Sequence, residues 1–209
     1  MGSHQEYQQL AEILANLARC SLGENKCFNK IEVSFYGNLH NSAEAMFLPI
    51  CDGVFPDAGS FQNEQGAFKF LNRNGIVFKS RDVDESKNYG ESITLDLLEN
   101  ETCLSSVRGT FTEGKMMISR LNDFDNLYLA PHGWNIFFEY EDKPGVIAKL
   151  SGILSISGIN IADIRAPQVK TGAFPRSLAA IKTDTEVPDE LLMKMADFVN
   201  AISAFKFNC

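Results

Sequence analysis

The sequence predicts an α+β protein with two domains, a mixed α/β domain followed by a domain with the element order βαββαβ. Three observations carry this prediction. The 209 residues, 44% of them hydrophobic, suffice for two cores. Segments with apolar residues at alternate positions are interspersed with segments whose apolar residues recur at helical spacing. A stretch rich in turn residues, 123–133, separates the two sets of segments.

The first domain is expected to combine helices with an antiparallel sheet. Apolar residues recur at helical spacing over 6–20 and predict a helix that Gly23 ends. Alternating apolar residues over 30–36 predict a half-buried strand. Two further helices, then four strands joined as an antiparallel meander, are expected at 42–54, 61–74, 76–83, 91–98, 102–111 and 115–121.

The second domain has more regular signals. A strand is expected over 134–140, and Pro144 begins a helix that Gly158 ends. Two strands, a helix and a last strand follow at 160–166, 177–184, 188–202 and 203–207. The resulting order, βαββαβ, is the ferredoxin-like arrangement, in which both helices cover one face of a four-stranded sheet. A sheet of this kind leaves a face or an edge for a partner, so we expect self-association.

The boundaries divide the chain into three parts. Residues 1–22 are predicted to be a tag remnant and a linker helix, 23–130 the mixed α/β domain, and 131–209 the βαββαβ domain. The opening Met1-Gly2-Ser3-His4 resembles a remnant of an expression vector, which would make the chain a piece of a longer protein.

Charge and cysteine content exclude several functional classes. The 19 basic and 27 acidic residues give a formal net charge of -8, which disfavours binding to nucleic acid or an acidic membrane. No apolar run approaches the roughly 20 residues that cross a bilayer, and no signal peptide is evident, so a cytoplasmic location is expected. The five cysteines are scattered without Cys-x-x-Cys spacing and are predicted to be reduced thiols rather than metal ligands.

Signatures of catalysis are absent from the sequence. There is no Gly-x-Gly-x-x-Gly, Walker loop, Gly-x-Ser-x-Gly or His-Glu-x-x-His. His40 and His132 lie in polar or turn-rich segments, where a histidine without a function is common. We therefore predict no catalytic residue, metal or cofactor in this chain.

One motif suits the binding of an amino acid. The stretch Tyr140-Glu141-Asp142-Lys143-Pro144-Gly145-Val146-Ile147 is followed, further along, by Gly158-Ile159-Asn160-Ile161. The amides of Gly145, Val146 and Ile147 would form the positive end of a helix, which attracts a carboxylate. Asp142 could pair with an ammonium group, and Asn160 could bind a side-chain hydroxyl. In the alternative interpretation, Asp142 caps the helix and Asn160 shapes a turn.

This motif resembles the opening of an ACT domain, particularly in the D-3-phosphoglycerate dehydrogenase family. The resemblance extends upstream to Leu10-Ala11-Glu12, Ile31-Glu32-Val33, Tyr36-Gly37 and Val107-Arg108-Gly109-Thr110. These segments are similar to the intervening, allosteric-substrate-binding domain of the longer form of that enzyme. The resemblance implies a regulatory region, with the catalytic domains and their NAD cofactor absent from this chain.

The resemblance also implies a ligand and its site. L-serine would bind between two subunits of a homodimer or tetramer, at a set of residues comprising Tyr140, Asp142, Lys143, Gly145, Val146, Ile147, Asn160 and Ile161. The family's intervening domain also holds an anion, for which this chain offers Lys115, Arg120 and His132. Asp123 and Asp125 add the wrong charge there.

Three other functions remain as alternatives. The chain could be an independent amino-acid sensor or the regulatory domain of an L-serine dehydratase subunit. It could also be a purely structural oligomerisation module. RNA binding on the sheet is disfavoured, because the aromatic residues of 137–140 lie among Glu139 and Glu141 rather than among basic residues.

Overall fold

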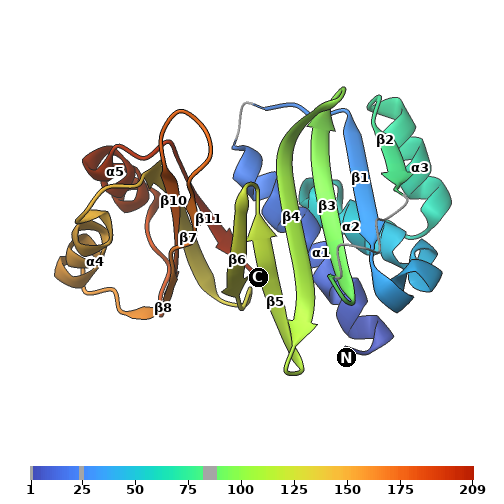
Figure 1. The fold of residues 1–209 in the computed structure, drawn as a ribbon. Coiled ribbons are helices and arrows are strands. Elements are labelled where there is room, and N and C mark those ends of the chain that lie inside the picture. The colour runs from blue at the N-terminus through green and yellow to red at the C-terminus, as the bar shows by residue number, and fades with distance from the viewer. Residues whose placement is uncertain (1, 24–25, 82–88) are drawn as a thin grey trace. The chain divides into compact units, whose positions relative to one another are not determined.

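The computed structural model describes residues 2–23, 26–81 and 89–209 of an α+β protein (Figure 1). The chain forms two compact units, Met1–Asn122 and Asp123–Cys209. The division falls after Asn122, whereas we expected it near residue 130.

The first unit combines three α-helices with a sheet. Its α-helices and strands are α1 (His4–Leu22), β1 (Lys30–Phe35), α2 (Phe47–Val54), α3 (Glu64–Arg73), β2 (Val77–Ser80), β3 (Ser92–Glu99), β4 (Thr102–Thr112) and β5 (Lys115–Leu121). Short 3-10 helices occupy Gly37–Ser42, Glu44–Met46 and Pro56–Ala58. The helix expected over 42–54 is therefore shorter, because its first part is 3-10 and irregular. The strand expected over 76–83 ends at Ser80, and its last two positions lie outside the described residues.

The strands of this unit lie in the order β2-β1-β3-β4-β5. The antiparallel meander is confirmed for β3, β4 and β5 but is wrong for β2, which pairs parallel to β1 with Val77 opposite Lys30. The segment between β1 and β2, with its helices, supplies the crossover that a parallel pair requires. The sequence pattern of one short strand carries no information on the direction of its neighbour.

Helix α1 packs in the core of the first unit rather than serving as a linker. Ser3 caps it, because its hydroxyl accepts the Glu6 amide at 3.3 Å and the Glu6 carboxylate accepts the Ser3 amide at 2.6 Å. Leu10 and Leu14 are 0% exposed and lie against Gly109 of β4, where a Cβ atom would come within 3.0 Å of both leucines.

Helix α2 approaches α1 equally closely, at Gly53. A Cβ atom there would lie 2.2 Å from the carbonyl oxygen of Glu12 and 2.8 Å from the Cβ of Ala15. The same helix carries Cys51, whose thiol is fully buried. Gly53 lets α2 approach the backbone of α1, and Gly109 lets the leucine side chains of α1 lie directly on β4.

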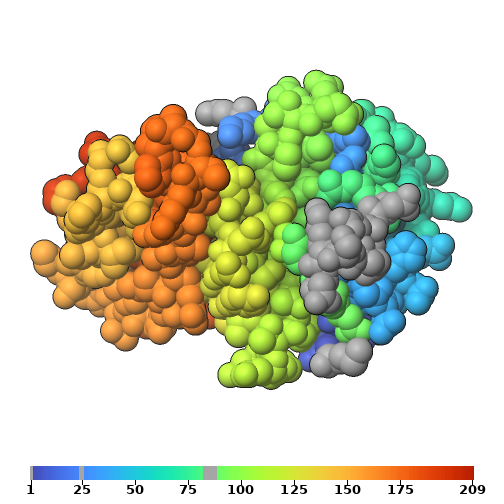
Figure 2. Space-filling view, viewed as in Figure 1, coloured from blue at the N-terminus to red at the C-terminus, as the bar shows by residue number. Residues whose placement is uncertain are grey.

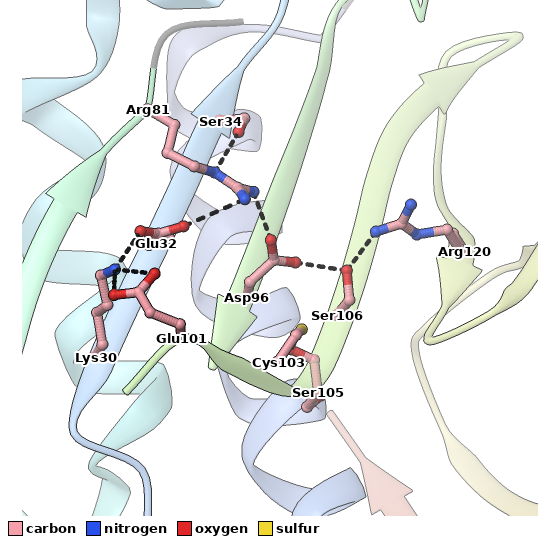
Figure 3. A network of polar contacts seen from close by, with 10 residues as sticks. All are labelled: Lys30, Glu32, Ser34, Arg81, Asp96, Glu101, Cys103, Ser105, Ser106 and Arg120. Carbon is pink, nitrogen blue, oxygen red and sulfur yellow. Dashed lines mark hydrogen bonds and ion pairs between the residues drawn. The ribbon is translucent and has the colours of Figure 1, made fainter. Parts of the chain in front are cut away.

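The opposite face of this sheet carries a network of ionic and hydroxyl groups (Figure 3). Asp96 accepts from Arg81 Nη2 at 2.5 Å and from the Ser106 hydroxyl at 2.5 Å. Arg81 also pairs with Glu32 at 3.3 Å, and Lys30 pairs with Glu32 at 2.8 Å. Glu32 is only 7% exposed, so β1 is buried on both faces and the expectation of a half-buried strand was wrong.

The second unit has the ferredoxin-like arrangement. Its elements are β6 (Phe124–Leu129), β7 (Trp134–Glu141), α4 (Val146–Ile156), β8 (Ile161–Arg165), β9 (Gln168–Val169), β10 (Arg176–Thr183), α5 (Asp189–Val199) and β11 (Ser203–Asn208). The sheet order is β11-β7-β10-β8, with all neighbours antiparallel and β9 beside β10. Helices α4 and α5 cover one face of these strands, around a core that includes Phe138, Leu150, Ile181 and Met195 (Figure 1).

Strand β6 lies in the stretch where we expected only a joint. Phe124, Leu127 and Leu129 are buried, but their spacing does not alternate strictly. Asn126 and Tyr128 have positive φ angles of 60° and 45°, which interrupt the regular extended backbone. The sequence of β6 therefore lacks the strict alternation that predicts a strand.

Candidate functional site

The loop between β7 and α4 contains the predicted carboxylate, Asp142. Its amide donates to the carbonyl oxygen of Pro175 at 2.9 Å, and one of its carboxylate oxygens accepts the Ser177 hydroxyl at 3.1 Å. The cap of α4 is Gly145, and no side chain bonds to the first turn of the helix. The alternative in which Asp142 caps the helix is therefore wrong, and its exposed carboxylate is held by strand β10 instead.

The first turn of α4 presents backbone donors. Gly145 has a φ of 89°, in the region that favours glycine, so the helix begins at Val146, two residues later than the proline pattern suggested. The first hydrogen bond of the helix runs from the Lys149 amide to the Gly145 carbonyl at 3.0 Å. The amides of Val146 and Ile147 have no backbone acceptor among the described residues. Because Gly145 is exposed, this turn is open to a ligand.

Tyr140 belongs to β7, two residues before Asp142, and lies in the core between the sheet and the helices. It is 3% exposed, and it stands opposite Ser177 in the pairing of β7 with β10. Burial raises the pKa of the Tyr140 hydroxyl, a hydrogen bond with Ser177 lowers it, and the charge of Asp142 raises it further. Tyr140, Asp142 and Ser177 therefore form one polar cluster.

Ser177 was missed by the sequence analysis. Its side chain is 1% exposed and faces the same side of the sheet as Tyr140. Only the register of two strands that are distant in sequence brings it to Asp142. A single sequence carries no signal for that register beyond the alternation of each strand.

Two other predicted residues flank this cluster without joining it. Lys143 is exposed and pairs with Glu141 at 2.7 Å. Ile147 packs partly buried against the core under α4.

The structure places Asn160 and Ile161 at the other end of the sheet. The Asn160 amide donates to the Asp184 carboxylate at 3.1 Å, and the Asp184 amide donates to the Asn160 carbonyl at 3.1 Å. Strand β10 separates β8 from β7, so these strands are parallel to each other and not adjacent. Asn160 precedes β8 and Asp142 follows β7, so one chain does not bring them together as we expected.

The candidates for an anion site do not converge either. Lys115 begins β5 and is exposed, whereas Arg120 stands near the other end of that strand and donates to the Ser106 hydroxyl. His132 belongs to the second unit, where its Nδ1 lies 3.7 Å from the Cys209 sulfur. Asp123, which we expected to oppose an anion, binds Arg176 at 2.6 Å.

No group of three or more histidine, cysteine, aspartate or glutamate side chains among the described residues could hold a metal ion. None of the helices that the structure describes has the length and apolar character required to span a bilayer.

Comparison with known proteins identifies the second unit. The model of the family described as ACT domain matches residues 134–200. D-3-phosphoglycerate dehydrogenase of Methanocaldococcus jannaschii is 24% identical over 96% of this chain and 37% of its own length. That of Bacillus subtilis is 24% identical over 68% of this chain and 29% of its own. An ACT domain protein from Streptococcus pneumoniae, of known structure, is 22% identical over 35% of this chain and 84% of its own, with a TM-score of 0.27.

The chain thus spans 37% and 29% of the lengths of these two relatives. The matched ACT segment begins with β7 and ends just after α5, so it includes the loop that holds Asp142 and the first turn of α4. Residues 134–200 of this chain are therefore an ACT domain, and the chain is homologous to the C-terminal part of D-3-phosphoglycerate dehydrogenases.

Proposed function

We propose that this chain is an amino-acid-sensing regulatory region and that its effector is L-serine. The observation that carries the proposal is that one loop presents both a negatively charged carboxylate and the positive end of a helix. The exposed carboxylate of Asp142 lies four residues before Val146, the first residue of helix α4, and the Val146 and Ile147 amides have no acceptor among the described residues. A zwitterionic amino acid presents the two complementary charges, an ammonium for the carboxylate and a carboxylate for the amides.

The third contact, to the serine hydroxyl, is assigned to Asn160 of the partner subunit. Strand β8 stands at the end of the sheet order, with β10 on one side. Antiparallel pairing of β8 with its copy about a two-fold axis would carry the partner's Asn160 toward the end of the sheet at which β7 and β8 both terminate. Asp142 lies at that end. The separation of Asp142 from Asn160 in one chain supports a site shared by two chains.

The same proposal assigns catalysis and NAD binding to domains outside this chain. We expect that titration with NAD produces no heat and that the chain does not oxidise 3-phosphoglycerate. The two alternatives with amino-acid binding, an independent sensor and a serine dehydratase subunit, share the same site. Finding which coding sequence precedes this segment in the native gene would separate them.

Replacing Asp142 with alanine is expected to weaken L-serine binding roughly ten- to a hundredfold. The loss corresponds to about 1.5–3 kcal/mol for a hydrogen bond to a charged group. Asn160→Ala should cost less, about 0.5–1.5 kcal/mol, because its bond is between neutral groups. Calorimetric titration of each variant measures both effects. Asp197→Ala, a matched change of charge on the exposed side of α5, should bind as the wild type does.

Association should accompany binding. We expect a two-fold pair at micromolar concentration, and we expect an equal mixture of Asp142→Ala and Asn160→Ala chains to recover up to a quarter of the wild-type sites. Such recovery occurs only if each site takes the two residues from different chains. A monomer with full serine affinity would contradict the shared site. Association without any serine binding would favour the purely structural module.

A further inference from the structure

Strand β8 is the last strand in the sheet of the second unit. It pairs with β10 on one side, and no strand among the described residues pairs with its other side. Strand β9 continues it in the same register, because Arg165 stands opposite Ala180 and Gln168 stands opposite Ser177. In the space-filling view this region, coloured orange, forms a continuous part of the surface of the second unit (Figure 2). The edge can therefore accept a further strand.

Two oppositely charged side chains lie along this edge. Asp163 and Arg165 are two residues apart, so they project from the same face of the strand. Arg165 Nε donates to Asp163 Oδ2 at 3.1 Å, and Arg165 Nη2 lies 3.0 Å from the same oxygen. The Asp163 side chain is 34% exposed and that of Arg165 is 46% exposed. Both groups are therefore accessible to a second partner.

The contact within the strand leaves part of each charged group unused. Asp163 Oδ1 and Arg165 Nη1 have no hydrogen-bond partner among the described residues. A guanidinium and a carboxylate make their strongest contact when two nitrogens meet two oxygens, whereas here two nitrogens share one oxygen. On the β10 side Arg165 stands opposite Ala180, which offers no charge. A carboxylate placed on the free side of β8 would complete the contacts of Arg165.

A second copy of β8 supplies such a carboxylate in one register. When two copies pair antiparallel about a two-fold axis at Ile164, Asp163 stands opposite the partner's Arg165, and Arg165 stands opposite the partner's Asp163. An axis at Asp163 would place two carboxylates opposite each other, and an axis at Arg165 would place two guanidinium groups there. Opposite residues have Cβ atoms about 4.5–5.5 Å apart, so like charges repel at these positions. The axis at Ile164 is the one that pairs both charges.

We infer that two reciprocal ion pairs, each between Asp163 of one chain and Arg165 of the other, fix the register in which two copies of β8 associate. This inference rests on the proposed function, which includes the pairing of β8 with its copy. The same axis sets Ile164 against the partner's Ile164. Because Ile164 is partly buried against the core of its own unit, this contact adds an apolar centre between the two ion pairs.

The register also determines where the second chain completes the effector site. With the axis at Ile164, the partner's Asn160 lies beside Gln168. Gln168 stands opposite Ser177, whose hydroxyl donates to Asp142. Moving the axis by one residue would shift the partner strand by two residues, about 7 Å along the edge. The two ion pairs therefore set the distance between Asn160 of one chain and Asp142 of the other.

Reversal of each charge tests the register, with the dimer dissociation constant measured by analytical ultracentrifugation. Asp163→Arg places two arginines opposite each other at both positions, and Arg165→Asp places two aspartates there, so each variant should weaken the dimer at least tenfold. The chain with both changes restores opposite charges and should associate as the wild type does. Single variants that associate normally, or a double variant that stays weak, would overturn the inference.

An equal mixture of the two single variants gives an independent measurement. One chain then carries two arginines and the other two aspartates, so the heterodimer has opposite charges at both positions and each homodimer has like charges. Native mass spectrometry should detect mostly the heterodimer, and a statistical mixture would contradict the ion pairs. Asp197→Arg, a matched reversal on the exposed side of α5, should leave dimerisation unchanged. Unchanged thermal melting would show that the variants are folded.

Titration with L-serine separates this inference from the proposed function. The double variant should bind serine as the wild type does, and the single variants should bind it more weakly at concentrations where they are monomers. If the single variants remain dimers with full serine affinity, the register is wrong and the proposed function stands. If the wild type neither associates nor binds serine, both are wrong.

Discussion

The Gly53→Ala variant is expected to lose about 3 kcal/mol of unfolding free energy, the upper part of the range for overpacked cores. The new methyl group would overlap the Glu12 carbonyl, which is backbone and cannot rotate away. Helix α2 must then move off α1, and the contacts of both helices with the sheet are disturbed together. Urea unfolding followed by circular dichroism measures the change.

Gly66→Ala in α3 is the matched control for this prediction. A Cβ atom at Gly66 would meet only the Asn63 side chain at 3.5 Å, an ordinary contact. Because alanine is the better helix former, this variant should be neutral or more stable by up to about 1 kcal/mol. If both alanines change stability equally, the close packing of α1 on α2 is not what constrains Gly53.

The second large effect is expected at Asp96. In Asp96→Ala, Arg81 and Ser106 lose an acceptor on a face where Asp96 is only 7% exposed. Breaking a fully buried pair costs about 3–5 kcal/mol, but the Arg81 side chain is 33% exposed, so we expect about 2–3 kcal/mol. Asp96→Asn, which keeps one acceptor oxygen, should lose less.

Asp189→Ala supplies the comparison for Asp96. Asp189 also forms a short ion pair, to Lys206 at 2.6 Å, but its side chain is 80% exposed. Solvent screens such a pair, so its removal should leave unfolding nearly unchanged. A loss at Asp189 as large as that at Asp96 would mean that burial does not set the strength of these ion pairs.

The sequence predicts much of this fold because its helices carry their own start and stop signals. The helix that Gly23 ends, and the helix that Gly158 follows, are found where propensity and pattern agree. Strand β6 is not found, because the positive φ angles of Asn126 and Tyr128 break its alternation. The parallel pairing of β2 is not found, because its partner β1 lies far away in the chain. Local sequence patterns predict whether a segment is a helix or a strand, whereas packing of the whole unit determines which strand it pairs with.

The candidate site also combines features that are encoded locally with features that depend on strand pairing. The carboxylate of Asp142 and the open helix start are encoded within a few residues, so the motif reveals them. Ser177 joins them only through strand register, and the direction of β8 places Asn160 at the opposite end of the sheet. No local sequence pattern predicts the register of β7 with β10 or the direction of β8.

The buried thiol of Cys51 is a natural probe of local opening in the first unit. Burial, aided by the neighbouring charge of Asp52, raises its pKa to about 12, so a thiolate does not form at neutral pH while α2 is in place. Reagents that alkylate thiolates can reach this sulfur only when the packing around Cys51 opens transiently. The rate at which Cys51 is alkylated under native conditions therefore reports how often this part of the first unit opens, and the measurement needs no substitution.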